Sequence, residues 1–319
     1  MAQLRDVINN GLLKLPTSAN TSSVGNVWFD ESTQRAKYSW YGGLWSTGGA
    51  LITARFNLGG VGTQNAGLAF GGSSPSLVSC TEEYNGTSWS AGGSLINGRQ
   101  ALAGAGTQNA GLAFGGSGGA PYFSCTEEYD GSSWSAGGSL IVARQQLAGA
   151  GTQNEALAFG GFLVSGIITC TEEYNGASWT TGGVLINARG QSGGAGTQNS
   201  GLTFGGQAPG SVAISCTEEY NGTSWAAGGA LITARCTLAG AGTQNAALAF
   251  GGCAPLRSCT EEYNGSSWST GGALITASAA LAGAGEQGAG LAFGGVAPSQ
   301  LSCTQEYNIS INQSNLGSR

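Results

Sequence analysis

Short apolar runs alternate with polar turns along most of this chain. In one stretch, LAGAG (102–106) and GLAFGG (111–116) are separated by the polar turn TQN (107–109). CTEEY (125–129) follows, then the turn Asp-Gly and a fourth run that opens at Trp134. Short runs bounded by Gly, Asn and Asp are typical of antiparallel strands, and Asp-Gly is a strong hairpin signal. The stretch therefore predicts four short antiparallel strands.

This four-strand unit of about 45 residues fills the chain in near-identical copies. A unit of this length cannot bury its own apolar face, so the copies must pack against one another. Four strands per unit, without a polar capping repeat, favour a propeller over a solenoid. We therefore expect an all-β protein, a six-bladed β-propeller of four-stranded antiparallel blades. The period is marked by Trp45, Trp89, Trp134, Trp179, Trp225 and Trp268.

The two ends of the repeat indicate how the ring closes. No tryptophan follows Tyr307 in the last unit, whereas Trp45 precedes the first complete unit without a hairpin of its own. We expect the N-terminal strand to complete the last blade, because this removes an open sheet edge. The predicted boundaries are 1–43 for an N-terminal arm and docking hairpin, 44–311 for the propeller and 312–319 for a C-terminal tail.

The amino-acid composition limits the kinds of partner that the protein can bind. The 59 glycines recur at matched positions, which favours turns and close packing over a fibre. Charged residues make up only 9% of the chain and the net charge is -6, so we expect no nucleic-acid partner. No apolar run approaches the roughly 20 residues that span a bilayer, and the N-terminus lacks the apolar core of a signal peptide. We expect a soluble protein, made without export and not inserted in a membrane.

The chemistry of the side chains argues against catalysis. The chain has no histidine, the commonest general base and metal ligand, and no recognised catalytic motif. We expect no enzyme activity, cofactor or metal. Paired glutamates such as Glu127 and Glu128 point to opposite faces of a strand and cannot converge on one ligand. We expect one of each pair to bind a repeated arginine and the other to be solvated or to bond backbone. Ser278 replaces that arginine in the last unit, so no ion pair is expected there.

Six of the eight cysteines occupy equivalent places in successive units, and we expect them to be small buried packing residues. The other two differ. Antiparallel pairing would bring Cys236 close to Cys253, so a disulfide is geometrically open to them, while the lack of an export signal argues for free thiols.

The TQN turns are the first candidate binding site. They join the two innermost strands of each unit and would ring one mouth of the central channel. Uncharged amides and hydroxyls suit sugar hydroxyls, but the same residues are also ordinary self-capping turn residues. Glu286, Gln287 and Gly288 are expected to interrupt the ring in the last unit. The candidate ligand-binding residues are Gln64, Asn65, Gln108, Asn109, Gln153, Asn154, Gln198, Asn199, Gln244 and Asn245.

The linkers between the second and third strands are the second candidate. They differ in length and sequence from unit to unit, while the strands scarcely change. Recognition commonly sits in such loops on a rigid scaffold, although neutral drift predicts the same pattern. The candidate partner-contact residues are Tyr122, Phe123, Phe162 and Leu163.

The unit resembles the kelch motif over roughly residues 44 to 308. The shared features are a glycine pair closing the second strand, a Tyr several residues before a Trp, and an Arg before the next unit. The resemblance implies a propeller. Kelch-type copper oxidases depend on histidines, so their chemistry is not carried over to this chain.

The repeat text GTQNAGLAFGG followed by CTEEYNGTSW is also similar to kelch-like proteins of marine tailed phages. Residues 25–45 resemble the Trp-turn-Tyr-Trp hairpins of phage tail and fibre proteins. The resemblance implies a virion protein, assembled in the host cytoplasm and present in multiple copies. Its arm would dock on other virion proteins, or else cover the side of the propeller. The propeller would bind protein, or a host-surface glycan or receptor; a free glycan-binding lectin is the alternative.

Overall fold

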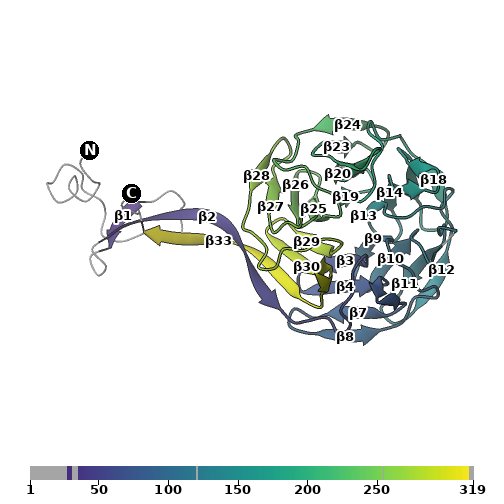
Figure 1. Ribbon diagram of the computed structural model, residues 1–319, viewed down its shortest axis with the longest axis horizontal. Coiled ribbons are helices and arrows are strands. Elements are labelled where there is room, and N and C mark those ends of the chain that lie inside the picture. Colours follow the sequence, from purple (N-terminus) through teal and green to yellow (C-terminus); the bar gives the residue numbers. More distant parts are fainter. Residues whose placement is uncertain (1–26, 31–34, 120, 254, 316–319) are drawn as a thin grey trace. The chain divides into compact units, whose positions relative to one another are not determined.

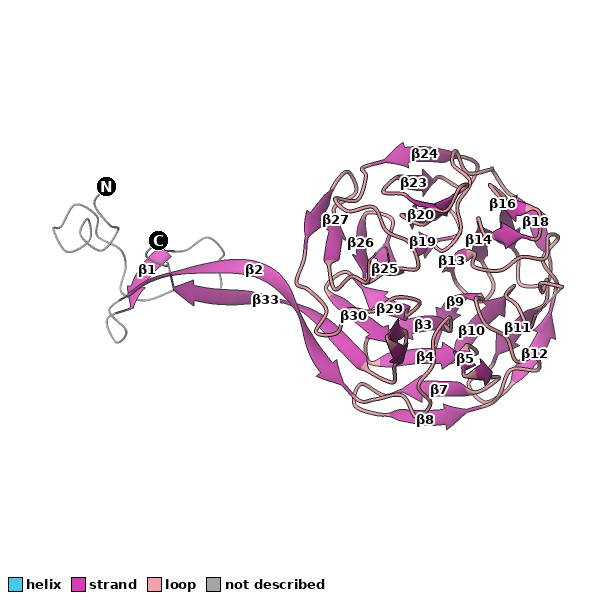
Figure 2. Ribbon diagram, viewed as in Figure 1, coloured by secondary structure: helices cyan, strands magenta, loops and turns pink. Residues whose placement is uncertain are grey.

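The computed structural model describes residues 27–30, 35–119, 121–253 and 255–315. These residues form strands, turns and loops, and none of them is helical (Figure 2). The chain divides into two compact units, residues 45–308 and residues 1–44 with 309–319. The larger unit is a ring of antiparallel sheets around a central axis (Figure 1).

Five blades are each built from one continuous stretch of chain, with the first strand next to the axis and the fourth at the rim. Blade 1 consists of β3 (Gly59–Thr63), β4 (Ala66–Phe70), β7 (Thr81–Tyr84) and β8 (Trp89–Gly92). Blade 2 consists of β9 (Ala103–Thr107), β10 (Ala110–Phe114), β11 (Thr126–Tyr129) and β12 (Trp134–Gly137). Blade 3 consists of β13 (Ala148–Gly151), β14 (Ala156–Phe159), β17 (Thr171–Tyr174) and β18 (Trp179–Thr181). Blade 4 consists of β19 (Gly193–Thr197), β20 (Ser200–Phe204), β23 (Thr217–Tyr220) and β24 (Trp225–Gly228). Blade 5 consists of β25 (Ala239–Thr243), β26 (Ala246–Phe250), β27 (Thr260–Tyr263) and β28 (Trp268–Thr270).

The sixth blade joins the two ends of the repeat. Its first three strands are β29 (Ala282–Glu286), β30 (Ala289–Phe293) and β33 (Thr304–Asn315), and its fourth is β2 (Arg35–Gly48), which also pairs with β1 (Val27–Asp30). The rings of Trp45 and Tyr307 lie 5.0 Å apart. The predicted fold class and the predicted closure by an N-terminal strand are both confirmed.

Aromatic side chains pack each blade against the one before it. Trp134 of blade 2 contacts Tyr129 of its own blade and Phe70 of blade 1, with ring centroids 5.0 and 5.1 Å apart. Its indole Nε1 donates to Thr81 Oγ1 of blade 1 at 2.8 Å, so the buried N–H is satisfied. The same arrangement recurs around the ring.

Glycine lets the innermost strands approach. A Cβ at Gly104 of β9 would lie only 2.7 Å from the ring of Phe70 and 2.9 Å from Val61, both in the preceding blade. A larger residue would push these strands apart, which accounts for the repeated glycine there.

Four of the variable linkers each form a small hairpin whose two strands have two residues apiece. These are β5 (Ser73–Ser74) with β6 (Ser76–Leu77), β15 (Phe162–Leu163) with β16 (Gly166–Ile167), β21 (Gln207–Ala208) with β22 (Val212–Ala213), and β31 (Val296–Ala297) with β32 (Ser299–Gln300).

Candidate functional site

The propeller has two different faces because its strands alternate in direction. The turn face carries the turns between first and second strands and between third and fourth strands. The loop face carries the variable linkers and the connectors, which we define as the ten residues that lead into the inner strand of each blade from the outer strand before it. Bridges such as Gln100↔Ser117 join a connector to a linker, which places both on one face. The connectors are residues 49–58, 93–102, 138–147, 183–192, 229–238 and 272–281.

On the turn face, the repeated glutamines hold neighbouring blades together. Gln108 Nε2 donates to the backbone carbonyls of Gly67 at 3.0 Å and Tyr84 at 2.7 Å, both in the preceding blade. Gln287 makes the equivalent bonds to Ala247 and Tyr263. The expected interruption in the last unit is therefore wrong for the glutamine. The residues that bond in this way are Gln64, Gln108, Gln153, Gln198, Gln244 and Gln287.

These bonds give the glutamines of the TQN turns a structural role. Both amide protons of each glutamine are used within the propeller, so this donor is not offered to a ligand. Thr152 Oγ1 accepts the N–H of Glu155 at 3.1 Å, which is the self-capping role of an ordinary turn. Ligand binding here stays a prediction that would rest on the asparagines, which are exposed. They are Asn65, Asn109, Asn154, Asn199 and Asn245.

On the loop face, two of the four predicted partner-contact residues lie together. Tyr122 of the blade 2 linker and Leu163 of the blade 3 linker line an open groove of about 450 Å³, together with Val164. Val164 is 84% exposed. An apolar groove between two variable linkers is the kind of surface that a partner can cover.

The other two predicted contact residues are used inside the fold. A side chain at Gly118 would meet the ring of Phe123 at 2.7 Å, and one at Gly190 would overlap the ring of Phe162. Each phenylalanine therefore covers a glycine of the backbone, and both side chains are half-buried.

Each connector presents one exposed isoleucine from a fixed backbone. The N–H of Ile96 donates to Glu127 Oε2 at 2.6 Å, and Glu127 is paired with Arg99 at 3.2 Å with both side chains buried. The side chain of Ile96 is 58% exposed. Sequence reasoning did not single out this residue, although it recurs in every copy. The set is Ile52, Ile96, Ile141, Ile186, Ile232 and Ile275.

The predicted ion pairs are present in blades 1 to 5. They join Arg55 to Glu82, Arg99 to Glu127, Arg144 to Glu172, Arg189 to Glu218 and Arg235 to Glu261, all buried. Desolvation lowers the pKa of Arg55 and Arg235, although the neighbouring glutamates partly oppose this. In blade 6, Ser278 takes the place of the arginine and Gln305 the place of the glutamate.

The second glutamate of each pair has a definite partner that the sequence reasoning missed. Glu83 Oε1 accepts a hydrogen bond from the hydroxyl of Tyr129, in the next blade, at 2.5 Å. Burial of the phenol, helped by this bond, raises the pKa of Tyr129 to about 12. These glutamates therefore join blades instead of being merely solvated.

At the channel mouth on the loop face, the connectors form a closed ring of backbone hydrogen bonds. The N–H of Gln191 donates to the carbonyl of Gln146 at 2.8 Å, and that of Gln146 to Ala101 at 2.7 Å. The ring closes where Asn57 donates to Ala280 at 2.8 Å. Its members, one per blade, are Asn57, Ala101, Gln146, Gln191, Thr237 and Ala280.

All six members of this ring, which we call the mouth ring, have a positive φ between 51° and 56°. This left-handed conformation costs an L-residue about 1 kcal/mol or more, and a β-branched residue such as Thr237 adopts it rarely. Sequence reasoning missed the ring because only Asn57 is a residue type that favours such a conformation.

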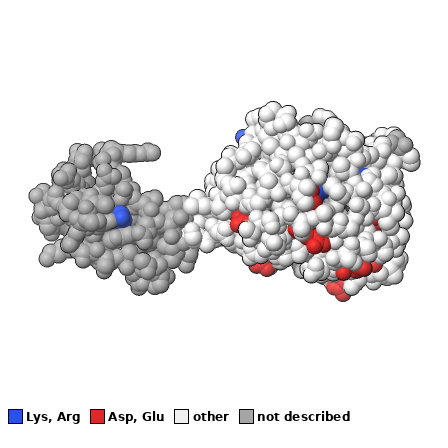
Figure 3. Space-filling view, turned by 90° about the horizontal axis from the view of Figure 1, so that it is seen from below, with Lys and Arg blue, Asp and Glu red and all other residues white. Residues whose placement is uncertain are grey.

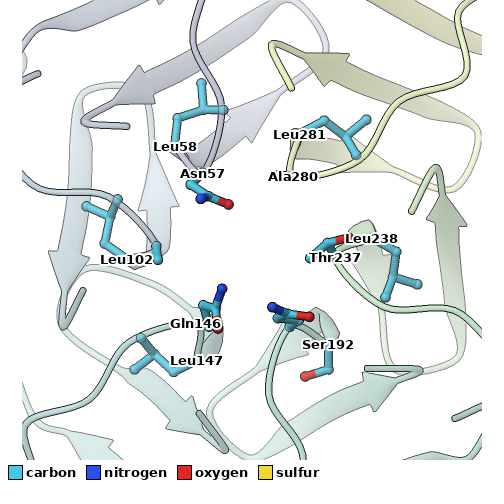
Figure 4. Close-up of a pocket in the computed structure, with 12 residues that line it drawn as sticks. Asn57, Leu58, Leu102, Gln146, Leu147, Ser192, Thr237, Leu238, Ala280 and Leu281 are labelled. Carbon is cyan, nitrogen blue, oxygen red and sulfur yellow. The ribbon is translucent and has the colours of Figure 1, made fainter. Parts of the chain in front are cut away.

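The mouth ring surrounds a cavity of about 90 Å³ (Figure 4). The amides of Asn57 and Gln146 point into the opening, and leucines such as Leu58 and Leu102 lie behind them. None of the twelve lining residues is charged. The cavity can therefore offer hydrogen bonds and an apolar wall, but no ion pair.

Charge is unevenly placed on the propeller. Asp130, Glu155 and Glu286 all lie in or beside turns of the turn face. In Figure 3 the visible acidic side chains gather in the lower half of the propeller, and its upper part is almost uncharged. Within the described ranges, no three Cys, Asp or Glu side chains are grouped as a metal site would need. The described residues also contain no helix with the length and apolarity to cross a membrane.

The two extra cysteines lie side by side on the loop face. Cys236 and Cys253 form an antiparallel bridge pair, and their Sγ atoms are 2.7 Å apart as free thiols. The Cys236 thiol bonds the sulfur of Cys253, which lowers the pKa of Cys253. A disulfide between them stays a prediction, which thiol counting with and without reductant would test. The six repeated cysteines are free, but they are half-buried and not fully buried as expected. Cys80 Sγ accepts a hydrogen bond from Arg55 at 2.9 Å.

Comparison with known proteins supports the fold alone. The solved structure titled "Structure of YjhT" resembles this chain with a TM-score of 0.68. The match covers 82% of this chain and 99% of that chain, at 10% sequence identity. No protein-family model and no curated protein matches the sequence. The comparison therefore agrees with the six-bladed propeller architecture and leaves its activity open.

Proposed function

We propose that this protein is a non-catalytic binding protein that uses the loop face of its propeller to contact a partner. The observation that carries the proposal is where variation falls. The strands, ion pairs and aromatic contacts repeat almost unchanged, while the linkers differ in every blade and all emerge on one face. A rigid frame with variable loops is the usual design of a recognition surface.

The chemistry of the loop face favours apolar contact with a protein partner. It presents six exposed isoleucines and the groove at Tyr122 and Leu163. Contacts of this kind are individually weak, but several on one rigid body, and many copies on one particle, add up.

The role we propose is display on a tailed-phage particle. The support is the resemblance of the repeat text and of residues 25–45 to phage kelch-like, tail and fibre proteins. The N-terminal arm, residues 1–43, would then dock on other virion proteins. Most of the arm lies outside the described residues, so its docking role rests on the sequence.

Absence of catalysis is part of the proposal. The chain has no histidine, and the repeated carboxylates are committed to other groups. Glu127 is held by Arg99 and by connector amides, and Glu128 accepts from Tyr174. A carboxylate engaged in this way is a poor general base.

The particle assignment is tested by mass spectrometry of purified phage particles whose genome encodes this chain. We expect its peptides at many copies per particle. A chain that is absent from particles but abundant in the lysate would contradict the virion role and favour the free lectin.

The loop-face assignment is tested with Leu163→Asp, which places a charge in the groove. The matched control is Asn154→Asp, which adds the same charge on the turn face of the same blade. We expect adsorption of the isolated protein to host cells or to particles lacking it to fall only for Leu163→Asp. Equal loss in both variants, or loss only in the control, would contradict the proposal.

A further inference from the structure

Equivalent positions of the six blades carry different side chains around the cavity inside the mouth ring. Blades 3 and 4 contribute Gln146 and Gln191, and blade 5 contributes Thr237. Blade 1 contributes Asn57, which lies between the alanines of blades 2 and 6. The cavity is therefore polar along the arc of blades 3 to 5 and at Asn57 opposite, with room beside each alanine, which suits a ligand without sixfold symmetry.

The amides of this arc are available to a ligand. The backbone N–H groups and carbonyls of the mouth ring are bonded to one another. The side chains of Gln146 and Gln191 are half-buried and make no hydrogen bond to any of the described residues. This differs from the turn face, where both protons of every repeated glutamine amide are used. Amides that face an open cavity and have no partner in the protein can exchange their water for the hydroxyls of a ligand.

The positive φ angles of the mouth ring also indicate that its side chains serve a binding site. The chain has 59 glycines and places them at most other positive-φ sites, yet no glycine occupies the mouth ring. Gln146, Gln191 and Thr237 remain there in a conformation that glycine would adopt without cost. Strained residues of this kind cluster at functional sites, where the side chain is needed.

From these observations we infer that the mouth ring binds an uncharged polyhydroxy group, the edge of a sugar ring, through the amides of Gln146 and Gln191. Amides both donate to and accept from hydroxyls, and the leucines behind them match the C–H faces of a sugar. A cavity of about 90 Å³ has room for several water molecules, so it takes the edge of one ring and leaves the rest of a glycan outside. The inference goes beyond the proposed contact with a protein partner, because it assigns a sugar ligand to the centre of the same face.

The first experiment titrates the whole protein with neutral methyl hexopyranosides, and with hexuronic acids as charged counterparts. Binding is followed by saturation-transfer NMR and calorimetry. We expect at least one neutral glycoside to bind, and its uronic acid counterpart to bind less well because the cavity has no cation. No binding across the neutral panel, or preference for the charged sugars, would overturn the inference.

The second experiment uses Gln191→Gly. We expect sugar affinity to fall about tenfold while the melting temperature rises by about 2 °C, since glycine relieves the positive φ. A purely structural glutamine would give no such combination of opposite changes. Gln146→Leu, which keeps the side-chain bulk, should also weaken sugar binding about tenfold. The matched control, Thr223→Ala in the exposed turn between β23 and β24 on the turn face of blade 4, should leave sugar affinity unchanged.

Unchanged sugar affinity in both mouth variants would overturn the inference. The proposed function is judged separately. If Leu163→Asp abolishes adsorption while no sugar binds, the loop face contacts a protein and the mouth ring is not its ligand site.

Discussion

The closing blade has the same four-stranded core as the other five blades, but it differs from them in how the chain supplies its strands and in its buried polar residues. Blades 1 to 5 each come from one stretch of chain and contain a buried Arg–Glu pair. Blade 6 takes its outer strand from the N-terminal side and has Ser278 and Gln305 in place of that pair. Gln305 Oε1 still accepts the N–H groups of Ile275 and Thr276, at 2.7 and 3.4 Å. The connector therefore needs an acceptor at this position, and it needs a charged one only where an arginine lies beside it.

Deleting residues 1–48 removes β2, the outer strand that blade 6 takes from the N-terminal side. This change should have the largest effect on the stability of the propeller. The edge of β33 would lose its partner and the rings of Tyr307 and Phe250 would lose Trp45. We expect the cooperative thermal transition to disappear and the protein to aggregate, as judged by circular dichroism and size-exclusion chromatography. Deleting residues 1–34 keeps β2 and is the control. A folded monomer lacking residues 1–48 would show that closure is dispensable.

Arg99→Ser copies one half of blade 6 into blade 2. Glu127 would be left as a buried carboxylate without its cation, and we expect a loss of about 3 to 5 kcal/mol in the free energy of unfolding. Adding Glu127→Gln should bring the loss down to about 1 kcal/mol, because the amide oxygen still serves Ile96 and Asn97. Denaturant titration of both variants measures this. A double variant as unstable as the single one would refute the acceptor argument.

Trp45→Phe compares the packing at the closing joint with that at an ordinary joint. The change removes the indole N–H that bonds Thr260, and Trp134→Phe removes the bond to Thr81. We expect each variant to lose about 1 to 2 kcal/mol in denaturant titrations, since a buried hydroxyl is left without its donor. A clearly smaller loss for Trp45→Phe would mean that the closing joint is looser than the others.

Alkaline pH should weaken all the joints by a smaller amount. Burial and the glutamate partner raise the pKa of the repeated tyrosines to about 12, and raise that of Tyr307 as well. An unfolded tyrosine ionises near pH 10, so between about pH 10 and 12 the unfolded state loses protons that the folded state keeps. The contribution of these tyrosines is thus complete below pH 10 and declines as the pH rises toward 12.

The denaturant midpoint at pH 9 and pH 11.5 measures this decline. Tyr129→Phe should lessen the dependence on pH, and Tyr307→Phe should do the same at the closing joint. A midpoint that does not change over this range would contradict the assigned tyrosine–glutamate bonds.

Much of the fold could be predicted from the sequence because the repeat states it six times. The strand lengths, the blade count and the missing tryptophan after Tyr307 were enough to predict closure through Trp45. The ion pairs followed from one arginine and one buried glutamate per unit. The role of the turn glutamines could also have been found, since Gln287 is kept in the last unit where the flanking Thr and Asn are lost.

The mouth ring could not have been predicted from local signals. In a sequence, Gly, Asn and Asp are the residue types that indicate a positive φ, and Ala101, Gln146 and Thr237 do not belong to them. Their conformation is imposed by the closing of a ring of hydrogen bonds between segments about 45 residues apart. Such a constraint exists only once all the blades are in place, so the candidate cavity emerged from the structure and not from the pattern.

Closure by the N-terminal strand also has a mechanical consequence. The propeller is entered through Trp45 and left through Asn308, and both residues belong to the same blade. Tension applied through the termini is therefore borne by two neighbouring strands of one sheet, and the load path bypasses the other five blades. A module tethered in this way can be pulled hard at its attachment point while the surface it displays keeps its shape.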